Sequence, residues 1–308
     1  MTKRVNWVIA ALLLLIGAPY YWFLIDNRPG DVAAKPVTIA QLHQLADAMP
    51  GPHPTSVEVE LIGGRKVPST VLVAGTGLIE QPIAIMAFRL PVAGGKPIVI
   101  DSGITQSEGE EMGLQSWQPQ RQAAVERAMD EAGLILFTHE HPDHIGGMTA
   151  WIGKTGGFTG EAAAKIRLNR PQAEESARRL RIRHIDAGLN TTDAPFAVAP
   201  GVVAIPAPSH TPGSQMFFVR LANGREYLFA GDIATMAASW EQLRARSRLA
   251  GTILAPEDRR AVYAWLKTIR ALKAADPSLI VVPGHDAGPV LDRASGIRDG
   301  FDLSQIKA

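Results

Sequence analysis

Short apolar runs alternate with turns rich in glycine, proline and polar residues along most of the chain. Apolar runs of about four to eight residues between turn signals are typical of β-strands. We therefore expect strands, in chain order, over Val57–Ile62, Val71–Ala74, Ile83–Leu90, Ile98–Ile100, Leu134–Thr138, Lys165–Asn169, Val202–Ile205, Gln215–Leu221, Glu226–Ala230 and Leu279–Val282. The dipeptide Asn223-Gly224 predicts a tight hairpin between two of them.

Helical spacing of apolar residues appears between several of these strands. Thr38 is a good cap for a short helix that carries Ile39, Leu42, Leu45 and Met49 on one face. Strands with intervening helices in both halves predict an α/β (α+β) fold, in which two sheets pack face to face and the helices lie outside. The other helices are expected over residues 120–131, 171–181 and 256–274.

The longest apolar run lies near the N-terminus, from Val5 to Ile25, and contains no charged residue. About 20 apolar residues are enough to span a bilayer as a helix. Lys3 and Arg4 precede the run, and aromatic residues lie near both ends, at Trp7 and at Tyr20–Trp22. Basic flanks and interfacial aromatic residues are typical of membrane-spanning helices. The pattern predicts a transmembrane anchor over residues 5–25.

The basic residues also predict an orientation, with residues 1–4 as a cytoplasmic stub and the rest on the periplasmic or extracellular side of an inner membrane. A cleaved signal peptide, which would release the protein outside the cytoplasm, is the alternative. No small-residue cleavage pattern follows the run, and Pro19 stands near its end. Residues 26–37 resemble a linker, and residues 38–308 are predicted to form one domain.

Composition narrows the possible partners and ligands. The 308 residues, 46% of them hydrophobic, are sufficient for a large core. The 31 basic and 30 acidic residues nearly balance, so we expect no nucleic-acid partner. There is no cysteine, which excludes disulfides and thiolate ligands. Any metal must therefore rest on imidazole and carboxylate groups.

Such groups are concentrated in one segment, His139-Glu140-His141-Pro142-Asp143-His144, which follows the expected strand at Leu134–Thr138. Three further candidates stand in short loops after strands, and these are His210, Asp232 and His285. Imidazole and carboxylate oxygen are the ligands that catalytic zinc sites use. Each late residue alone is as well explained by a turn or surface position. Their common place at strand ends favours a single metal site.

The motif H-x-H-x-D-H, followed by His210, Asp232 and His285, resembles the metallo-β-lactamase fold superfamily of metallo-hydrolases. The resemblance covers roughly Val57 to Ala287 and implies a four-layer αββα sandwich of two mixed sheets, with a dinuclear site at the sheet edge. It implies that His139, His141 and His210 hold one metal, that Asp143, His144 and His285 hold the second, and that Asp232 bridges the two. It further implies that Asp101 supports the site from behind, although a turn aspartate would explain Asp101 equally well.

The resemblance also implies a hydrolase in which a metal-activated hydroxide attacks the substrate. Asp143 would orient this hydroxide and pass a proton to the leaving group. Two Zn²⁺ ions are the first expectation; iron or manganese are alternatives, because nitrogen and oxygen ligands discriminate weakly among these metals. The expected substrate is a small molecule that carries an ester, lactone or thioester bond.

Departures from known subfamilies shape this expectation. Asp232 disfavours a β-lactamase, since the related subclass generally lacks the bridging aspartate. The 23 residues after His285 are too few for the helical domain of glyoxalase II-type thioesterases, and the 52 residues between Asp232 and His285 leave no room for the insertion of nucleic-acid-processing members. Lactonases fit in size and ligands, but usually carry tyrosine where this chain has Thr235.

Alternatives on the same fold are an amide hydrolase of the β-lactamase kind, a phosphodiesterase, and an iron-dependent oxidoreductase similar to persulfide dioxygenases. A non-catalytic binding protein is disfavoured, because no ligand is missing. Substrate specificity is expected in residues 148–160, 186–199 and 236–256. Within them, Trp151 and Phe158, or Met236 and Trp240, are candidates either for an apolar pocket or for the ordinary core. The sequence leaves the oligomeric state open.

Overall fold

The computed structural model describes residues 3–155, 157–186, 188 and 192–302. Its first sheet contains β1 (Glu58–Pro68), β2 (Glu80–Leu90), β3 (Ile98–Ile100), β4 (Ser116–Trp117), β5 (Leu134–Leu136) and β11 (Arg298–Asp299). Its second sheet contains β6 (Phe196–Ala199), β7 (Val202–Pro206), β8 (Gln215–Arg220), β9 (Glu226–Gly231) and β10 (Ile280–Pro283).

The helices of the body lie before, between and after these strands. Regular helices are α3 (Ile39–Ala46), α4 (Ser69–Leu72), α5 (Gln106–Glu111), α6 (Pro119–Glu131), α7 (Pro142–Lys154), α8 (Gly160–Lys165), α9 (Arg170–Leu180), α10 (Ala237–Glu241), α11 (Arg259–Ala275) and α12 (Ala287–Leu291). Short 3₁₀ or π segments are η3 (Asp232–Ala234), η4 (Leu249–Leu254) and η5 (Arg293–Ser295).

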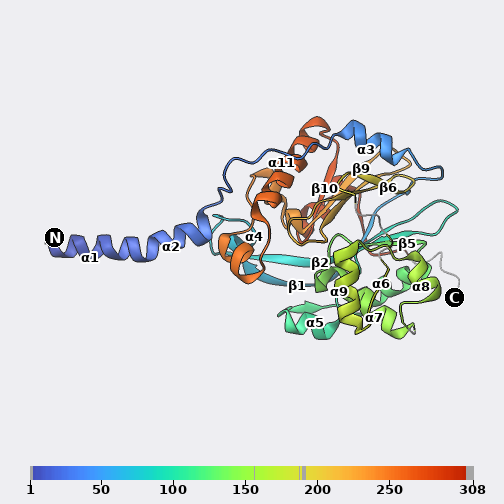
Figure 1. The fold of residues 1–308 in the computed structure, drawn as a ribbon, viewed down its shortest axis with the longest axis horizontal. Coiled ribbons are helices and arrows are strands. Elements are labelled where there is room, and N and C mark those ends of the chain that lie inside the picture. The colour runs from blue at the N-terminus through green and yellow to red at the C-terminus, as the bar shows by residue number, and fades with distance from the viewer. Residues whose placement is uncertain (1–2, 156, 187, 189–191, 303–308) are drawn as a thin grey trace.

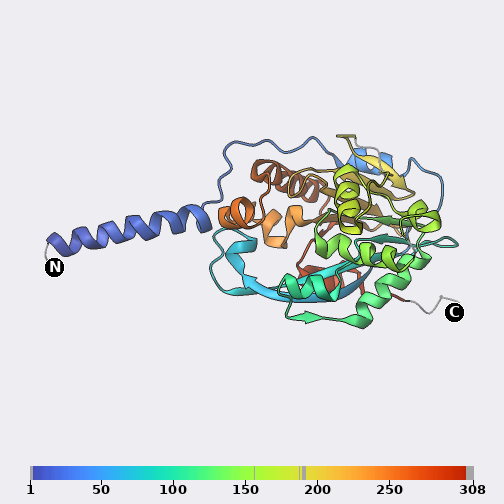
Figure 2. The same ribbon diagram turned by 60° about the horizontal axis from the view of Figure 1, so that its bottom comes forward.

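The two sheets lie face to face with helices on both outer surfaces, as Figure 1 and Figure 2 show. Strand order is β11-β1-β2-β3-β5 in the first sheet, with β4 beside β1, and β10-β9-β8-β7-β6 in the second. Both sheets are mixed, because β3 runs parallel to β5 and β9 runs parallel to β10 whereas the central pairs are antiparallel. The predicted αββα fold class is therefore confirmed.

Three layers of apolar side chains hold the sandwich together. The inner layer joins the two sheets, with Phe88 and Leu136 from one facing Phe217 and Phe229 from the other. A second layer joins the first sheet to α6, α7 and α9, and a third joins the other sheet to α3 and α11. Removal of this apolar surface from water is the main force that fixes the layers.

Several predicted elements are wrong in kind. Residues predicted as a strand at Val71–Ala74 begin within the short helix α4. An apolar run of four residues fits either element, and here Leu72 and Val73 pack against Met236. Residues 165–169 form no strand, only an isolated bridge between Ile135 and Ile166.

Helix α7 was not predicted, and it takes up half of a segment expected to be a specificity loop. Residues 148–154 belong to it, and Trp151 is buried in the core behind the first sheet, which supports its reading as a core residue. Position 156 of that segment, and positions 187 and 189–191 of the segment 186–199, lie outside the described residues. The pattern missed α7 because Gly146 and Gly147 interrupt it.

The N-terminal helix extends away from the body (Figure 1). It runs from Lys3 to Ile25 as α1 (Lys3–Leu12), η1 (Leu13–Gly17), α2 (Ala18–Tyr20) and η2 (Tyr21–Ile25). Its mean hydropathy is 2.2 and none of its apolar window is buried, so it is not a core helix of the body. Length and composition permit it to cross a membrane, and a signal sequence would have the same properties.

The segment predicted as a linker follows the surface of the body. Lys35 N donates a hydrogen bond to Thr268 Oγ1 over 2.7 Å, and Lys267 Nζ donates to the carbonyl of Val32. Both partners belong to α11. The predicted domain limits stay a prediction, but residues 32–35 are held against helix α11.

Candidate metal centre

The seven predicted ligands lie at one edge of the sandwich, where strands of both sheets end. His139 and His141 follow β5, and His210 lies between β7 and β8. Asp232 directly follows β9, and His285 is the second residue after β10. Because β9 and β10 are parallel, their carboxyl ends bring the last two residues to the same edge.

Helix α7 positions two more of the ligands. His141 precedes its first residue, Pro142, and Asp143 and His144 lie in its first turn. Proline suits this position, because its fixed φ fits the helix and the missing N–H would have no helical partner. Asp143 and His144 in this turn belong to one group of candidate ligands, whereas His139 and His141 before the helix belong to another.

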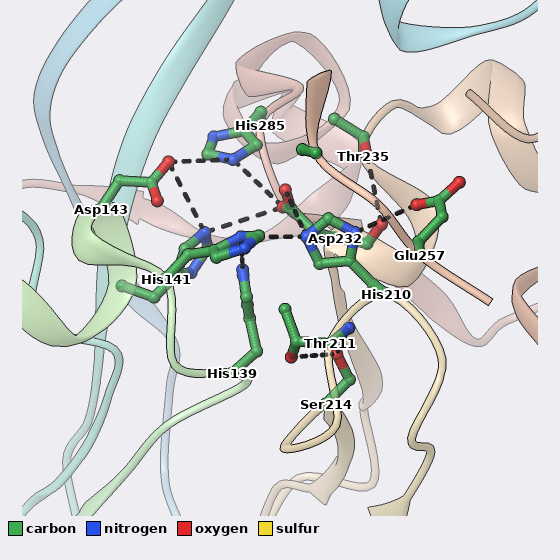
Figure 3. A network of polar contacts seen from close by, with 12 residues as sticks. His139, His141, Asp143, His210, Thr211, Ser214, Asp232, Thr235, Glu257 and His285 are labelled. Atoms are coloured by element: carbon green, nitrogen blue, oxygen red, sulfur yellow. Dashed lines mark hydrogen bonds and ion pairs between the residues drawn. The ribbon is translucent and has the colours of Figure 1, made fainter. Parts of the chain in front are cut away.

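The first group consists of His139, His141, His210 and Asp232, whose ligand atoms lie within 4.8 Å of one another. His141 Nδ1 lies 3.1 Å from His139 Nε2 and 3.1 Å from His210 Nε2. Asp232 Oδ2 lies 3.5 Å from His210 Nε2. Figure 3 shows these three rings directed at one another beside Asp232.

The second group consists of Asp143, His144 and His285. Asp143 Oδ2 lies 3.4 Å from His285 Nε2 and 4.0 Å from His144 Nε2. Asp232 Oδ1 lies 3.1 Å from His285 Nε2 and 3.7 Å from His144 Nε2. The two oxygens of Asp232 thus face different groups, as a bridging carboxylate requires.

The donor set fits divalent cations. His144 Nε2 and Asp232 Oδ1 are buried without a hydrogen bond among the described residues. Buried polar atoms nearly always have a hydrogen-bond partner, so two atoms with only ion-pair contacts at the centre of a histidine cluster require an explanation. Five imidazoles and two carboxylates form a nitrogen and oxygen set that suits zinc, iron or manganese.

Gly284 leaves room for the carboxylate of Asp232. A Cβ atom at this position would overlap Asp232 Oδ1. The φ angle of Gly284 lies outside the left-handed region, so the requirement for glycine is steric. Glycine immediately before His285 therefore leaves the space that the side chain of Asp232 occupies.

Contacts at Nδ1, the ring nitrogen that points away from the ligand cluster, fix the rings of His144 and His285. His144 Nδ1 lies 2.9 Å from Asp101 Oδ2, and His285 Nδ1 lies 2.8 Å from the carbonyl oxygen of Ala84. An acceptor on Nδ1 keeps the proton there and leaves the lone pair of Nε2 free for a metal. Asp101 adopts a left-handed φ of 60° and also accepts hydrogen bonds from Thr138 N and Oγ1. These contacts favour the supporting role over that of a simple turn residue.

Glu257 and Arg246 support His210, and no sequence pattern indicates either residue. Glu257 Oε2 lies 3.2 Å from His210 Nδ1, and its side chain is fully buried. Arg246 Nη2 lies 2.8 Å from the same oxygen, 3.2 Å from the carbonyl of Ala255 and 3.0 Å from His210 Nδ1. The two hydrogens of Nη2 therefore have acceptors at Glu257 and Ala255, so Nδ1 of His210 donates to Glu257.

Glu140 joins the two ligand loops from within the motif itself. Its carboxylate accepts hydrogen bonds from Gly213 N at 3.0 Å and from Thr211 Oγ1 at 2.7 Å. The loop that carries His210 is thereby tied to the loop that carries His139 and His141. Thr235, in contrast, directs its hydroxyl to the carbonyl oxygen of Asp232 at 3.2 Å.

Electrostatics reflect the crowding of histidines and carboxylates. Burial, helped by the neighbouring imidazoles, lowers the pKa of His139 well below its usual value. Burial also opposes the charge on His285, but Asp232 and Asp143 outweigh it and raise the pKa of His285 to about 10. Burial raises the pKa of Asp232, yet His285 and His210 more than offset it and hold that pKa well below the usual range. Without a metal, His285 and Asp232 therefore form an ion pair at neutral pH.

The family model of the metallo-beta-lactamase superfamily matches residues 90–285, nearly two thirds of the chain and all seven ligands. The chain belongs to the metallo-beta-lactamase superfamily. The predicted resemblance is confirmed, and so is the prediction of an enzyme: the chain is a metallo-hydrolase of this superfamily. No curated protein sequence matches it significantly.

Solved structures of this superfamily share the fold at low sequence identity. An N-acyl homoserine lactone hydrolase with N-hexanoyl-L-homoserine at its catalytic metal centre is 17% identical, with a TM-score of 0.58 over 80% of this chain and 98% of that one. A probable metal-dependent hydrolase from Staphylococcus aureus is 12% identical, with a TM-score of 0.53 over 76% and 90%. The dizinc quorum-quenching lactonase AidC is 12% identical, with a TM-score of 0.50 over 78% and 91%. These likenesses bear on the fold alone.

Proposed function

We propose that this chain is a dinuclear hydrolase that cleaves an ester, lactone or thioester bond in a small molecule. The observation that carries the proposal is the position of Asp232, with Oδ2 toward His210 in the first ligand group and Oδ1 toward His285 in the second. Zinc is the proposed metal, since the candidate ligands are five imidazoles and two carboxylates and one structural neighbour described above is a dizinc enzyme.

The proposed ligands divide between two ions. His139, His141 and His210 hold the first, Asp143, His144 and His285 hold the second, and Asp232 contacts both. Divalent cations in such a site supply a Lewis acid for the substrate oxygen and lower the pKa of bound water.

The remaining chemistry belongs to the side chains. Burial raises the pKa of Asp143, but His144 and His285 outweigh it and hold the carboxyl below its usual value. Asp143 is thus ionised and able to accept a proton. We assign it the role of orienting the nucleophile through hydrogen bonding and of passing a proton to the leaving group. The supporting contacts of Asp101, Glu257 and the Ala84 carbonyl keep the imidazoles in one orientation while this happens.

Lactones and related esters are the proposed substrates. Two of the structural neighbours described above are lactonases, one of them solved with a homoserine product at its metal centre. The hydroxyl of Thr235 points to the backbone of Asp232, so this chain places no phenol at that position and must orient the substrate carbonyl in another way.

A panel of compounds tests the proposed substrate class. Full-length zinc-loaded protein in detergent is assayed against lactones, aryl esters, thioesters, phosphodiesters and β-lactams, with Asp232→Asn as the inactive control. Turnover of the first three classes that is lost in the control supports the proposal. Turnover confined to phosphodiesters or β-lactams would refute the proposed bond type.

We further propose that Lys3–Ile25 is an uncleaved anchor that places the catalytic domain on the outer side of an inner membrane. The end of this helix is bound by the body: Arg248 donates to Asp26 over 2.7 Å and its guanidinium lies 4.0 Å from the centre of the Trp22 ring. A cleaved signal peptide would have no use for such contacts. Mass spectrometry of the protein from membranes should find the N-terminal segment intact, and a mature chain that begins after residue 25 would refute the anchor.

A further inference from the structure

Large apolar side chains that remain in solvent are concentrated at two places on the body. Outside the N-terminal helix, the four most exposed among the described residues are Leu78, Ile79, Ile253 and Leu254, which are 56–80% exposed. The other exposed ones, at Met49, Ile182 and Leu291, reach only 38–43% and stand singly. Single exposed apolar residues are common, but adjacent pairs this exposed indicate a contact surface.

The first pair lies beside the end of the N-terminal helix. Leu78 and Ile79 follow α4 in a turn that folds back on it, with Ser69 N donating to the carbonyl of Ile79. The carbonyl oxygen of Leu24 accepts from Thr70 Oγ1 at 2.7 Å and from Gly75 N at 2.9 Å. The turn is therefore bound to the last turn of the helix.

The second pair lies in another segment next to the same junction. Ile253 and Leu254 end η4, and Arg248 immediately precedes its first residue. Arg248 holds both Asp26 and Trp22, and η4 also contacts α4. Figure 1 and Figure 2 both show α4 next to the place where the N-terminal helix meets the body.

The length of the helix sets the level of the two pairs relative to a bilayer. At a rise of about 1.5 Å per residue, the 23 residues from Lys3 to Ile25 extend about 34 Å, slightly more than the roughly 30 Å of a hydrocarbon core. The aromatic residues Tyr20–Trp22 then lie at the headgroup level, where such side chains prefer to be. Contacts of the body at residues 22–26 hold both pairs close to that level.

We propose that Leu78, Ile79, Ile253 and Leu254 form an apolar collar that inserts into the boundary between headgroups and acyl chains of the bilayer that holds the anchor. The proposal depends on the anchor proposed above. Its occupant is lipid, because both segments of the collar adjoin the end of the membrane-spanning helix and share its interfacial level. A body held only by its anchor could tilt freely, whereas a collar in contact with lipid fixes its orientation.

The collar also adjoins the metal centre through the chain. Segment η4 lies between Arg246 and Glu257, and both residues hold His210 in place. Glu257 N donates to the carbonyl of Gly251 within η4 at 3.0 Å. Segment η4 therefore links the proposed collar to the two residues that hold His210.

The absence of cysteine makes a direct test possible. The full chain is prepared with a single substitution, Ile79→Cys or Ile253→Cys, labelled with an environment-sensitive fluorophore and reconstituted into phosphatidylcholine–phosphatidylglycerol vesicles. Lipids with a quencher attached near the headgroup report contact with the interface. Helix α9 lies away from the N-terminal helix in Figure 1, so Ile182→Cys, an exposed apolar position two residues after α9, is the matched control. Leu13→Cys, within the helix, reports on the anchor separately.

Blue-shifted emission and quenching by the shallow probe at positions 79 and 253, but not at 182, would support the collar. Aqueous emission at 79 and 253 in molecules whose position 13 is quenched by a deep probe would overturn the collar and leave the anchor intact. Blue-shifted emission without lipid quenching would overturn it as well, because a protein contact would then cover these side chains. An unquenched position 13 would refute the anchor itself.

Discussion

Replacement of Glu257 by glutamine tests whether the supporting contacts of the metal centre matter as much as the ligands. The side chain of Glu257 is fully buried and accepts from His210 Nδ1 at 3.2 Å and from Arg246 at 2.8 Å. Burial raises the pKa of Glu257, but the contacts with His210 and Arg246 prevail and hold it below its usual value, so the group is a carboxylate. Glutamine keeps the shape and removes the charge that strengthens the donor nitrogen of His210.

The expected effect is a loss of metal affinity at one group of ligands. Loss of a supporting contact of this kind usually costs about 10- to 100-fold in metal affinity, or about 1.4 to 2.8 kcal/mol. His210 belongs to the group of His139 and His141, so the affinity of this group for its ion should fall. The affinity of the group of His144 and His285 for its ion should change much less.

The assay is a competition titration of zinc against a chromophoric chelator, which resolves the two binding steps. Glu174→Gln, an exposed member of a surface ion pair with Arg170, is the matched control and should leave both steps unchanged. Circular dichroism confirms that both variants are folded. Two unchanged steps in folded Glu257→Gln would refute the role of Glu257, and so would a weakening confined to the other group.

Three further predictions follow from particular contacts. Gly284→Ala should displace the carboxylate of Asp232 and remove one equivalent of bound zinc, whereas Gly153→Ala, at a position with open space around it, should retain both zinc equivalents. Equal metal content of the two variants, measured by atomic emission, would contradict this prediction. Metal loading at pH 7 should release protons, because His285, with a pKa of about 10, is charged at pH 7 in the metal-free protein and must lose its proton to bind a cation. Calorimetry in two buffers of different ionisation enthalpy measures this release, and identical heats in the two buffers would contradict it. Arg89→Met should lower the free energy of unfolding in a urea titration by about 1–3 kcal/mol, since it removes one partner of the buried Glu58 carboxylate, which keeps its ion pair with Arg298. Arg170→Met at an exposed pair should cost at most about 1 kcal/mol in the same urea titration.

The seven ligand candidates were predictable because their chemistry is unusual at strand ends. Five of the eight histidines of the chain stand in loops shortly after strands or in the segment that follows β5. The bounds of β2, β3 and α6 were predictable within a few residues for a different reason, since their apolar spacing and turn signals agree. Local pattern and tertiary packing point to the same element in these cases.

Other features depend on contacts that no local pattern records. Helix α7 contains Gly147, which lowers helix propensity, yet a Cβ there would overlap the carbonyl oxygen of Ser102, so close packing requires glycine. Glu257 lies 25 positions after Asp232 in an unremarkable sequence, and only the fold brings it behind His210. Residues 71–74 were assigned to a strand because a run this short does not distinguish between a strand and a buried helical turn.

Metal content at saturation tests the central proposal most directly. The full-length protein is loaded with excess zinc, freed of unbound metal, and measured by atomic emission against its amino-acid content, in parallel with Asp232→Ala. We expect two zinc ions per chain in the natural sequence, and one or none in the variant, because both groups share this carboxylate. A single ion per chain that excess zinc cannot increase, or a variant that still binds two, would contradict the dinuclear site.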